Sequence, residues 1–279
     1  MNRRRFLTLS AAFACAPALA RADTWSGIAL GAEVSVTLYG SPDQTGPMLS
    51  AIPRRLRQIE QTFSLYEPSE LTRLNERGLA AMSPEFAHLI DLCDQAHGLT
   101  GGLFDSTIQS RWSNPQARTG WQHTSRNGRH LTLGAGQSLT LNGIAQGHAT
   151  DLIRADLQAA GADKALINIG EYAALSGPFH MGISDPVQGI VGQTSLTGTA
   201  VATSSPSATL INGAPHITGP MGEHPLWSTV SITADSAAMA DALSTAACMM
   251  PLTALRALKR QANLHKITVL DADGNLRTL

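Results

Sequence analysis

The sequence predicts an α+β fold in which mixed or antiparallel sheets are flanked by helices. Segments with apolar residues at every second position, as in strands, are interspersed with segments that repeat apolar residues at steps of three and four, as in helices. The two kinds follow one another without the regular alternation of a doubly wound sheet. The chain of 279 residues shows no internal repeat and no low-complexity linker.

The predicted elements follow from local patterns in chain order. Val34, Val36 and Leu38 alternate with other residues and share one face of the first strand. Ser83 before Pro84 marks a helix start, because serine caps helices and proline is tolerated at their first position. Helices are predicted over residues 47–63, 83–97, 149–160, 236–250 and 252–263, with a helical turn at 69–75. Strands are predicted over residues 28–39, 131–133, 139–141, 165–169, 227–234 and 267–270, with several short ones inside 176–210.

Residues 1–22 have the pattern of an export signal. Three arginines precede Phe6 and Leu7, an apolar stretch follows, and small residues offer cleavage sites near Ala20. The paired arginines favour the twin-arginine route, with an ordinary secretory signal as the alternative. Cys15 lacks the preceding leucine of a lipoprotein site. We therefore expect a domain over residues 23–279 that acts in the periplasm and has no stable membrane insertion, since no later segment is long and apolar enough to span a bilayer.

The composition excludes a nucleic-acid partner. Charged residues make up 15% of the chain, the formal net charge is −1 and aromatic residues make up 5%, so neither a basic surface nor a base-stacking surface is available. Beyond the signal, two cysteines remain, Cys93 and Cys248. In an oxidising compartment they could form a disulfide, but the apolar helical pattern around each favours two small buried side chains.

Two segments carry chemistry that fits together. Asp241 and Thr245 lie four residues apart, so they share one face of the predicted helix and offer a carboxylate and a hydroxyl. Such oxygen ligands suit Mg²⁺ bound alongside phosphates. Residues 141–147 form a loop with two glycines that leads into a helix, where backbone N–H groups can bind an anion. Together they indicate metal-assisted chemistry on a phosphate compound.

Six segments in a fixed order add a family resemblance. They are Leu30-Gly31-Ala32, residues 63–75, Gly102-Leu103-Phe104-Asp105, residues 141–151, His216-Ile217 and residues 240–246. In this order they resemble the motifs of the FAD:protein FMN transferases, the ApbE-like family, over nearly all of the chain after the signal. Each segment alone is a weak indication, whereas six in order are specific. The resemblance also implies an ApbE-like fold.

The resemblance implies a reaction and a set of site residues. FAD is split at its pyrophosphate, FMN passes to a Ser or Thr hydroxyl of an acceptor flavoprotein, and AMP leaves. Asp241, Thr245 and the backbone carbonyl of Gly143 hold Mg²⁺, and Ser244 stands where some members have a second acid. His216 precedes a loop rich in Gly and Pro, which makes it a candidate base for the incoming hydroxyl or a residue that positions the substrate, with Asp105 the next candidate base. The positions that bind FAD are Leu30, Tyr66, Leu103, Phe104, Asp105, Thr140, Gln146 and Ile217.

The chain departs from the family pattern at several site positions. Thr140 replaces an Asp, Asn142 a Gly, Gln146 a Lys or Glu, Glu171 a Gly, and Gly219 the Asp that follows the His-Ile pair. The variants at 142–147 and 170–171 are similar to those of the periplasmic accessory proteins of nitrous oxide reduction. A flavin carrier without transfer activity and an FAD pyrophosphatase are the alternative functions. The acceptor, the oligomeric state and the choice between Mg²⁺ and Mn²⁺ stay open.

Overall fold

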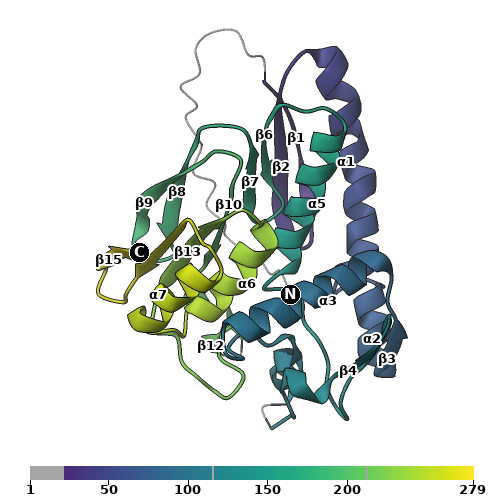
Figure 1. The fold of residues 1–279 in the computed structure, drawn as a ribbon, viewed down its shortest axis with the longest axis vertical. Coiled ribbons are helices and arrows are strands. Elements are labelled where there is room, and N and C mark those ends of the chain that lie inside the picture. The colour runs from purple at the N-terminus through teal and green to yellow at the C-terminus, as the bar shows by residue number, and fades with distance from the viewer. Residues whose placement is uncertain (1–21, 115, 212) are drawn as a thin grey trace.

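A computed structural model describes residues 22–279 except 115 and 212. Residues 1–21 of the predicted signal peptide therefore lie outside the described residues. Its centre is an eight-stranded sheet (Figure 1). The strand order is β1 (Ala22–Ala29), β2 (Ala32–Tyr39), β6 (Lys164–Asn168), β7 (Tyr172–Leu175), β10 (Ala200–Ser204), β13 (Thr229–Ala234), β14 (Lys266–Leu270) and β15 (Leu276–Thr278). Every neighbouring pair is antiparallel, which confirms the predicted α+β class.

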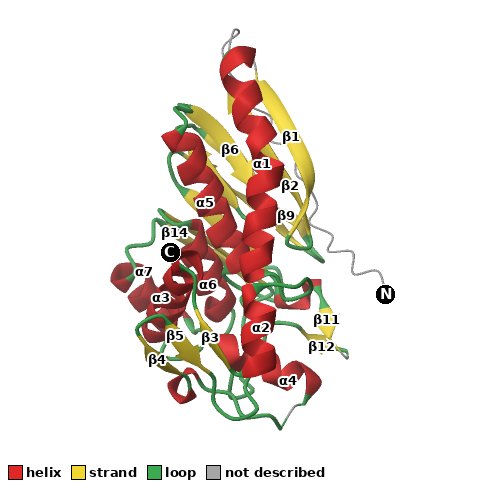
Figure 2. Ribbon diagram, turned by 90° about the vertical axis from the view of Figure 1, so that its right-hand side faces the viewer, coloured by secondary structure: helices red, strands yellow, loops and turns green. Residues whose placement is uncertain are grey.

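Helices cover one face of the large sheet, as the side view in Figure 2 makes clear. They are α1 (Pro42–Phe63), α5 (Ala145–Ala159), α6 (Ala237–Ala247) and α7 (Leu252–Gln261), and α3 (Pro84–Leu99) packs against α6 and α1. The main core lies between them and the sheet, where Val34, Val36 and Leu38 of β2 are buried as the sequence predicts. The other face is covered by the hairpin β8 (Phe179–Asp185) and β9 (Gly189–Leu196), which buries Ala174 and Val201. Both faces of the central strands are therefore covered.

Short elements fill the lower part of the molecule in Figure 1. A three-stranded sheet is formed by β3 (Leu79–Ala81), β5 (His130–Thr132) and β4 (Ser125–Asn127), and a small hairpin by β11 (Leu210–Ile211) and β12 (Ala214–Pro215). The remaining helical elements are α2 (Glu70–Arg77), α4 (Gln109–Ser113), η1 (Ser106–Ile108), η2 (Trp121–His123) and η3 (Pro206–Ala208). Residues 121–127 thus contain one helical turn, η2, and one short strand, β4.

Two of the predicted strands are corrected by the structure. Segment 28–39 spans the end of β1 and all of β2, because Leu30 and Gly31 both have positive φ angles (50° and 75°) and turn the chain between Ala29 and Ala32. Segment 139–141 is not a strand, although Leu139 and Leu141 are buried. The side-chain amide of Asn75 donates to the carbonyl of Leu139 and accepts from its N–H, so it takes the place of a partner strand.

Two predicted helices begin earlier than expected. The helix α1 starts at Pro42 after Ser41 rather than at Pro47, and α5 starts at Ala145 rather than at Ala149. The cap at Ser83 is confirmed, because its hydroxyl accepts from the N–H of Phe86. The earlier start of α5 matters most, since it places Gln146 and Gly147 in the first helical turn.

Cys93 and Cys248 are buried free thiols in the described chain. Burial raises the pKa of Cys93 to about 12 and raises that of Cys248 as well, so both stay protonated. They are packing residues, which agrees with the favoured interpretation of the sequence. Among the described residues, no helix is both long and apolar enough to cross a membrane.

Candidate active site

The site is built on a close contact between the first turn of α5 and the helix α6. A Cβ atom on Gly147 would lie 2.6 Å from the carbonyl carbon of Ala237 and 2.8 Å from the Cα of Ala238, so only glycine allows this approach. The N–H of Gly147 donates to Oδ2 of Asp241 at 3.1 Å. Asp241 is only 4% exposed. The contact joins the two segments that the sequence singles out, although 94 residues separate these two groups.

A second contact between the same segments joins Gly143 to Thr245. A Cβ on Gly143 would lie 3.0 Å from the Thr245 hydroxyl oxygen. Thr245 and Met239 are the two residues of α6 that are not buried, so the helix reaches the site surface at Thr245. The hydroxyl of Ser204, at the end of β10, lies 3.4 Å from that of Thr245. The loop, the helix and the strand end therefore bring several oxygen atoms together.

Ser244 has a different environment from Thr245. Its side chain is fully buried, its hydroxyl donates to the carbonyl of Asp241 at 3.1 Å, and it lies 2.7 Å from the hydroxyl of Ser204. These bonds attach α6 to β10. Thr245, rather than Ser244, is the hydroxyl next to Gly143.

The donor set fits a hard divalent cation. Asp241 supplies a buried carboxylate, and the Thr245 hydroxyl, one helical turn later, lies against Gly143. Within the described part of the chain, no group of three His, Cys, Asp or Glu side chains could hold a metal without other ligands. A cation here would thus depend on ligands from a bound phosphate compound, which is how Mg²⁺ is usually held.

Leu30 occupies a strained turn beside the first residues of α5. Its φ angle of 50° is unusual for a residue with a branched side chain. The N–H of Leu30 donates to Oε1 of Glu60 at 2.9 Å, and its carbonyl accepts from the side-chain amide of Gln146 at 3.3 Å. Both backbone groups of Leu30 are held by side chains from helices. Strain that the surroundings maintain in this way is characteristic of functional sites.

Tyr66 marks an outer edge of the site. Its hydroxyl accepts from the side-chain amide of Asn142 at 3.1 Å, and the residue is 58% exposed. Phe104, the other aromatic residue of the predicted set, is only 5% exposed and belongs to the main core. Leu103 is partly buried and packs against this core. Of the two rings, Tyr66 is the one that a flat ligand could reach.

Asp105 and Thr140 hold the loops beside the site. Oδ1 of Asp105 accepts from the N–H and the hydroxyl of Thr107, and Oδ2 accepts from the N–H of Trp121. The N–H of Thr140 donates to the carbonyl of Ser106, and its hydroxyl accepts from the N–H of Asn142. Asp105 and Thr140 therefore fix the backbone of the loops beside the site, and Thr140 does so directly before Asn142 and Gly143.

His216 lies directly after β12. Its Nδ1 is 2.9 Å from the carbonyl of Pro206 and 3.1 Å from that of Thr209. Carbonyl oxygens only accept, so the neutral ring carries its proton on Nδ1 and has its lone pair on Nε2. Ile217 packs against the main core and anchors the loop that follows. This tautomer is the one that can act as a base through Nε2.

Three residues with a role in the site are missing from the sequence-based set. They are Ser204, which lies beside Thr245, Glu60, which holds Leu30, and Asn142, which donates to Tyr66. Only Asn142 carries a signal in the sequence, as a departure from the family pattern. Ser204 and Glu60 reach the site through the antiparallel sheet and the long helix α1, which local patterns do not reveal.

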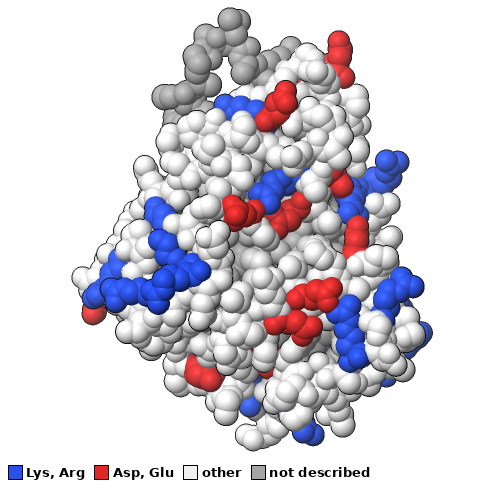
Figure 3. Space-filling view, in the orientation of Figure 1, with Lys and Arg blue, Asp and Glu red and all other residues white. Residues whose placement is uncertain are grey.

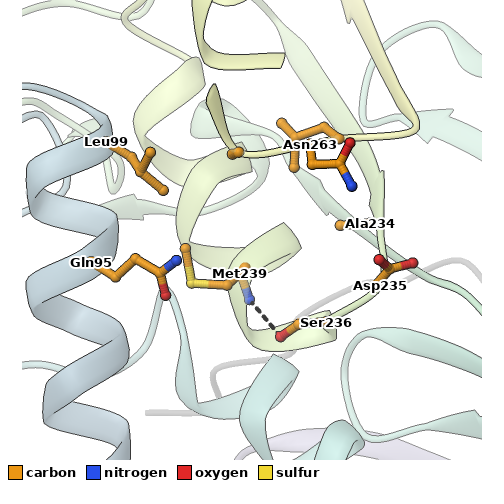
Figure 4. Close-up of a pocket in the computed structure, with 9 residues that line it drawn as sticks. Gln95, Leu99, Ala234, Asp235, Ser236, Met239 and Asn263 are labelled. Atoms are coloured by element: carbon orange, nitrogen blue, oxygen red, sulfur yellow. Dashed lines mark hydrogen bonds between the residues drawn. The ribbon is translucent and has the colours of Figure 1, made fainter. Parts of the chain in front are cut away.

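Two hollows of the surface lie away from the predicted site residues. Figure 4 shows one of about 130 Å³ between α3 and the start of α6, lined by Gln95, Leu99, Ser236 and Met239 among others. The other, of about 390 Å³, is lined by basic residues of α7, and Figure 3 shows blue side chains gathered on that side. None of the predicted site residues lines either hollow.

Comparison with known proteins identifies the family. The ApbE family profile matches residues 30–269, which include every predicted site residue. The chain belongs to the ApbE family. A curated relative of this family, the FAD:protein FMN transferase of Rhodobacter capsulatus, is 25% identical over 288 aligned positions. The alignment covers 88% of this chain and 55% of the relative, so the chain spans about half of that protein's length.

Solved structures of ApbE proteins share the fold. The apo flavinyl transferase ApbE of Pseudomonas stutzeri is 24% identical with a TM-score of 0.78, and the alignment covers 93% of this chain and 94% of that one. The ApbE protein of Thermotoga maritima is 20% identical with a TM-score of 0.83, with 92% and 96% covered. The ApbE-like fold predicted from the six segments is thus confirmed over nearly the whole chain.

Proposed function

We propose that this protein transfers FMN from FAD to a Ser or Thr hydroxyl of an acceptor flavoprotein and releases AMP. The observation that carries the proposal is the meeting of residues 143–147 with Asp241 and Thr245 in one oxygen-lined site. Membership of the ApbE family and the similarity to the FAD:protein FMN transferase of Rhodobacter capsulatus support the same reaction.

In this proposal Asp241, Thr245 and the backbone of Gly143 hold Mg²⁺. The cation would neutralise charge on the FAD pyrophosphate as its bridging oxygen departs. The backbone N–H groups of Ile144, Ala145 and Gly147 are bonded within the protein, so the start of α5 would favour the phosphates through its helix dipole. Nε2 of His216 takes the proton from the acceptor hydroxyl as that oxygen attacks the phosphate of the FMN half.

The remaining residues would place the two halves of FAD. Leu30 and Gln146 form one wall, because the Gln146 amide is fixed to the Leu30 carbonyl. Tyr66, exposed at the outer edge, offers its ring to a planar group of FAD. Asp105, Thr140 and Ile217 hold the loops on which the site depends.

A direct test mixes the purified protein, FAD, Mg²⁺ and a candidate acceptor domain. The expected product is an acceptor with the added mass of FMN, formed together with AMP. Release of FMN and AMP without any adduct would show an FAD pyrophosphatase instead.

Calorimetry with FAD and FMN separates the transferase from a carrier. We expect tighter binding of FAD, because the transferase must hold the adenylate half as well as the FMN half. Equal affinity for the two flavins, without adduct formation, would show a flavin carrier. Repeating the transfer with Mn²⁺ in place of Mg²⁺ establishes the preferred cation.

The place of action is also part of the proposal. The arginine pair before Phe6 and Leu7 supports export by the twin-arginine route to the periplasm, where the acceptor flavoprotein would be met. The variants at Asn142, Gln146 and Glu171 support a place among the accessory proteins of nitrous oxide reduction. Fractionation of cells that express the full chain, with and without both arginines replaced by lysine, tests the route.

A further inference from the structure

The loop after His216 contains a carboxylate in an unexpected place. A Cβ atom on Gly219 would lie 2.7 Å from Cβ and 2.8 Å from Cδ of Glu223, with the carboxylate oxygen Oε2 closer still. The backbone of Gly219 does not have a positive φ angle, so its conformation would suit any residue. The side chain of Glu223 is therefore what leaves no room for a side chain at position 219.

Hydrogen bonds fix Glu223 over Gly219. The N–H of Gly219 donates to the carbonyl of Glu223, the N–H of Gly222 donates to the carbonyl of Gly219, and the N–H of Met221 donates to Oε2 of Glu223 at 2.9 Å. The turn of residues 219–223 thus places the carboxylate of Glu223 against Gly219, the first residue of the turn. The residue is only partly buried, so the carboxylate stays accessible from solvent.

The turn is attached to the active site from two sides. The hydroxyl of Thr119 donates to the carbonyl of Pro220. The N–H of the neighbouring Gly120 donates to the hydroxyl of Thr107, and that hydroxyl in turn donates to Asp105. Leu226 donates to the carbonyl of Cys248, directly after α6. Gly219 lies three residues after His216, and three residues of extended chain span at most about 11 Å. The carboxylate is thus folded onto a residue whose Cα lies within about 11 Å of the Cα of the candidate base.

We propose that Glu223 supplies the carboxylate of this loop in place of an acid at position 219. It acts as a positioning residue: the bond to Met221 sets the shape of the loop after His216, and its negative charge favours the imidazolium that forms when His216 takes a proton. The inference rests on the proposed transfer reaction and explains why glycine stands at position 219.

The test moves the carboxylate between the two positions. Glu223→Gln keeps an oxygen that can accept from Met221 but removes the charge, and we expect turnover to fall by about 10-fold to 100-fold, the range seen when partners of catalytic groups are lost. FAD affinity should stay unchanged. Gly219→Asp alone should melt at a lower temperature than the wild type, because the new side chain meets Glu223. The double variant Gly219→Asp with Glu223→Ala should regain both stability and most of the turnover.

Each outcome decides the matter. Wild-type turnover in Glu223→Gln would overturn the proposal and show that Glu223 only closes the turn, whereas the transfer reaction itself would stand. Failure of the double variant to exceed Glu223→Ala in turnover would overturn it as well. If the wild type forms no adduct with any acceptor, the proposed function fails and this inference fails with it. Glu33→Gln, at an exposed glutamate of β2, is the matched control and should behave as the wild type.

Discussion

Replacing Gly147 by alanine tests the contact on which the site is built. The new Cβ would lie 2.6 Å and 2.8 Å from backbone atoms of Ala237 and Ala238, whereas ordinary contacts begin at 3.4 Å. The helices α5 and α6 would have to separate by close to 1 Å. Backbone atoms cannot avoid the contact by changing rotamer, so the cost belongs at the upper end of the usual range for overpacking, about 3 kcal/mol.

Part of that cost is offset by helix propensity. Alanine is favoured over glycine inside a helix by up to about 1 kcal/mol. The expected net loss is thus about 2 kcal/mol, which lowers the melting temperature of a domain of this size by roughly 4–8 °C. The same movement draws the N–H of Gly147 away from Asp241, so FAD binding in the presence of Mg²⁺ should weaken too.

Thermal denaturation of Gly147→Ala beside Gly98→Ala measures the effect. Gly98 is exposed in α3, and a Cβ there would meet no atom within 4 Å. Only the propensity gain acts at Gly98, so this control should be slightly more stable than the wild type. If Gly147→Ala is as stable as Gly98→Ala, the close approach of α5 and α6 is not a real feature of the protein and the reasoning fails.

Three further changes test individual side chains. Asp241→Ala should abolish transfer, and Asp241→Asn, which can still accept from Gly147, should stay as stable as the wild type but remain inactive; turnover by either variant would remove Asp241 from the reaction. His216→Ala should lower turnover by about 10² to 10⁴ with little effect on FAD affinity, and the wild-type rate should fall at acid pH as the imidazole is charged. Burial, with a smaller contribution from His88, lowers the pKa of His148 to about 4. The neutral, buried His148 therefore contributes fully to the free energy of unfolding above pH 6.5, and this contribution is lost as the pH falls towards 4. Over that window the loss is about 3 kcal/mol, and urea denaturation of His148→Leu should show a much weaker dependence on pH.

The sequence predicts most elements because their burial patterns are local. The alternation in residues 32–39 and the serine and proline before α3 depend on residues within one element, and both predictions are confirmed. The turn at Leu30 and Gly31 is different. Two-residue hairpin turns of this kind usually carry Asn-Gly or Asp-Gly, and Leu30 is held there by Glu60 and Gln146, which are distant in sequence.

Segment 139–141 is a second case in which a residue distant in sequence decides the local structure. Alternating leucines report burial, and burial usually accompanies a strand, but here a single side chain supplies the backbone partner. Nothing in the pattern around Asn75 distinguishes an amide that pairs with a distant backbone from one that faces solvent. The pattern therefore gives the burial of Leu139 correctly and its secondary structure wrongly.

The departures from the family pattern are not isolated changes, since each has a partner that suits it. Gln146 lies so close to Gly170 that a Cβ on Gly170 would be 2.6 Å from its Cδ, and the amide then reaches the Leu30 carbonyl. Glu171, next in the chain, accepts from the N–H of Thr203 beside Ser204. Gly219 is matched by Glu223 in the same way. Restoring one family residue at a time would therefore bring its side chain into collision with the neighbour that now occupies that space. Activity in this chain is for this reason better tested by exchanging both residues of a pair than by single reversions.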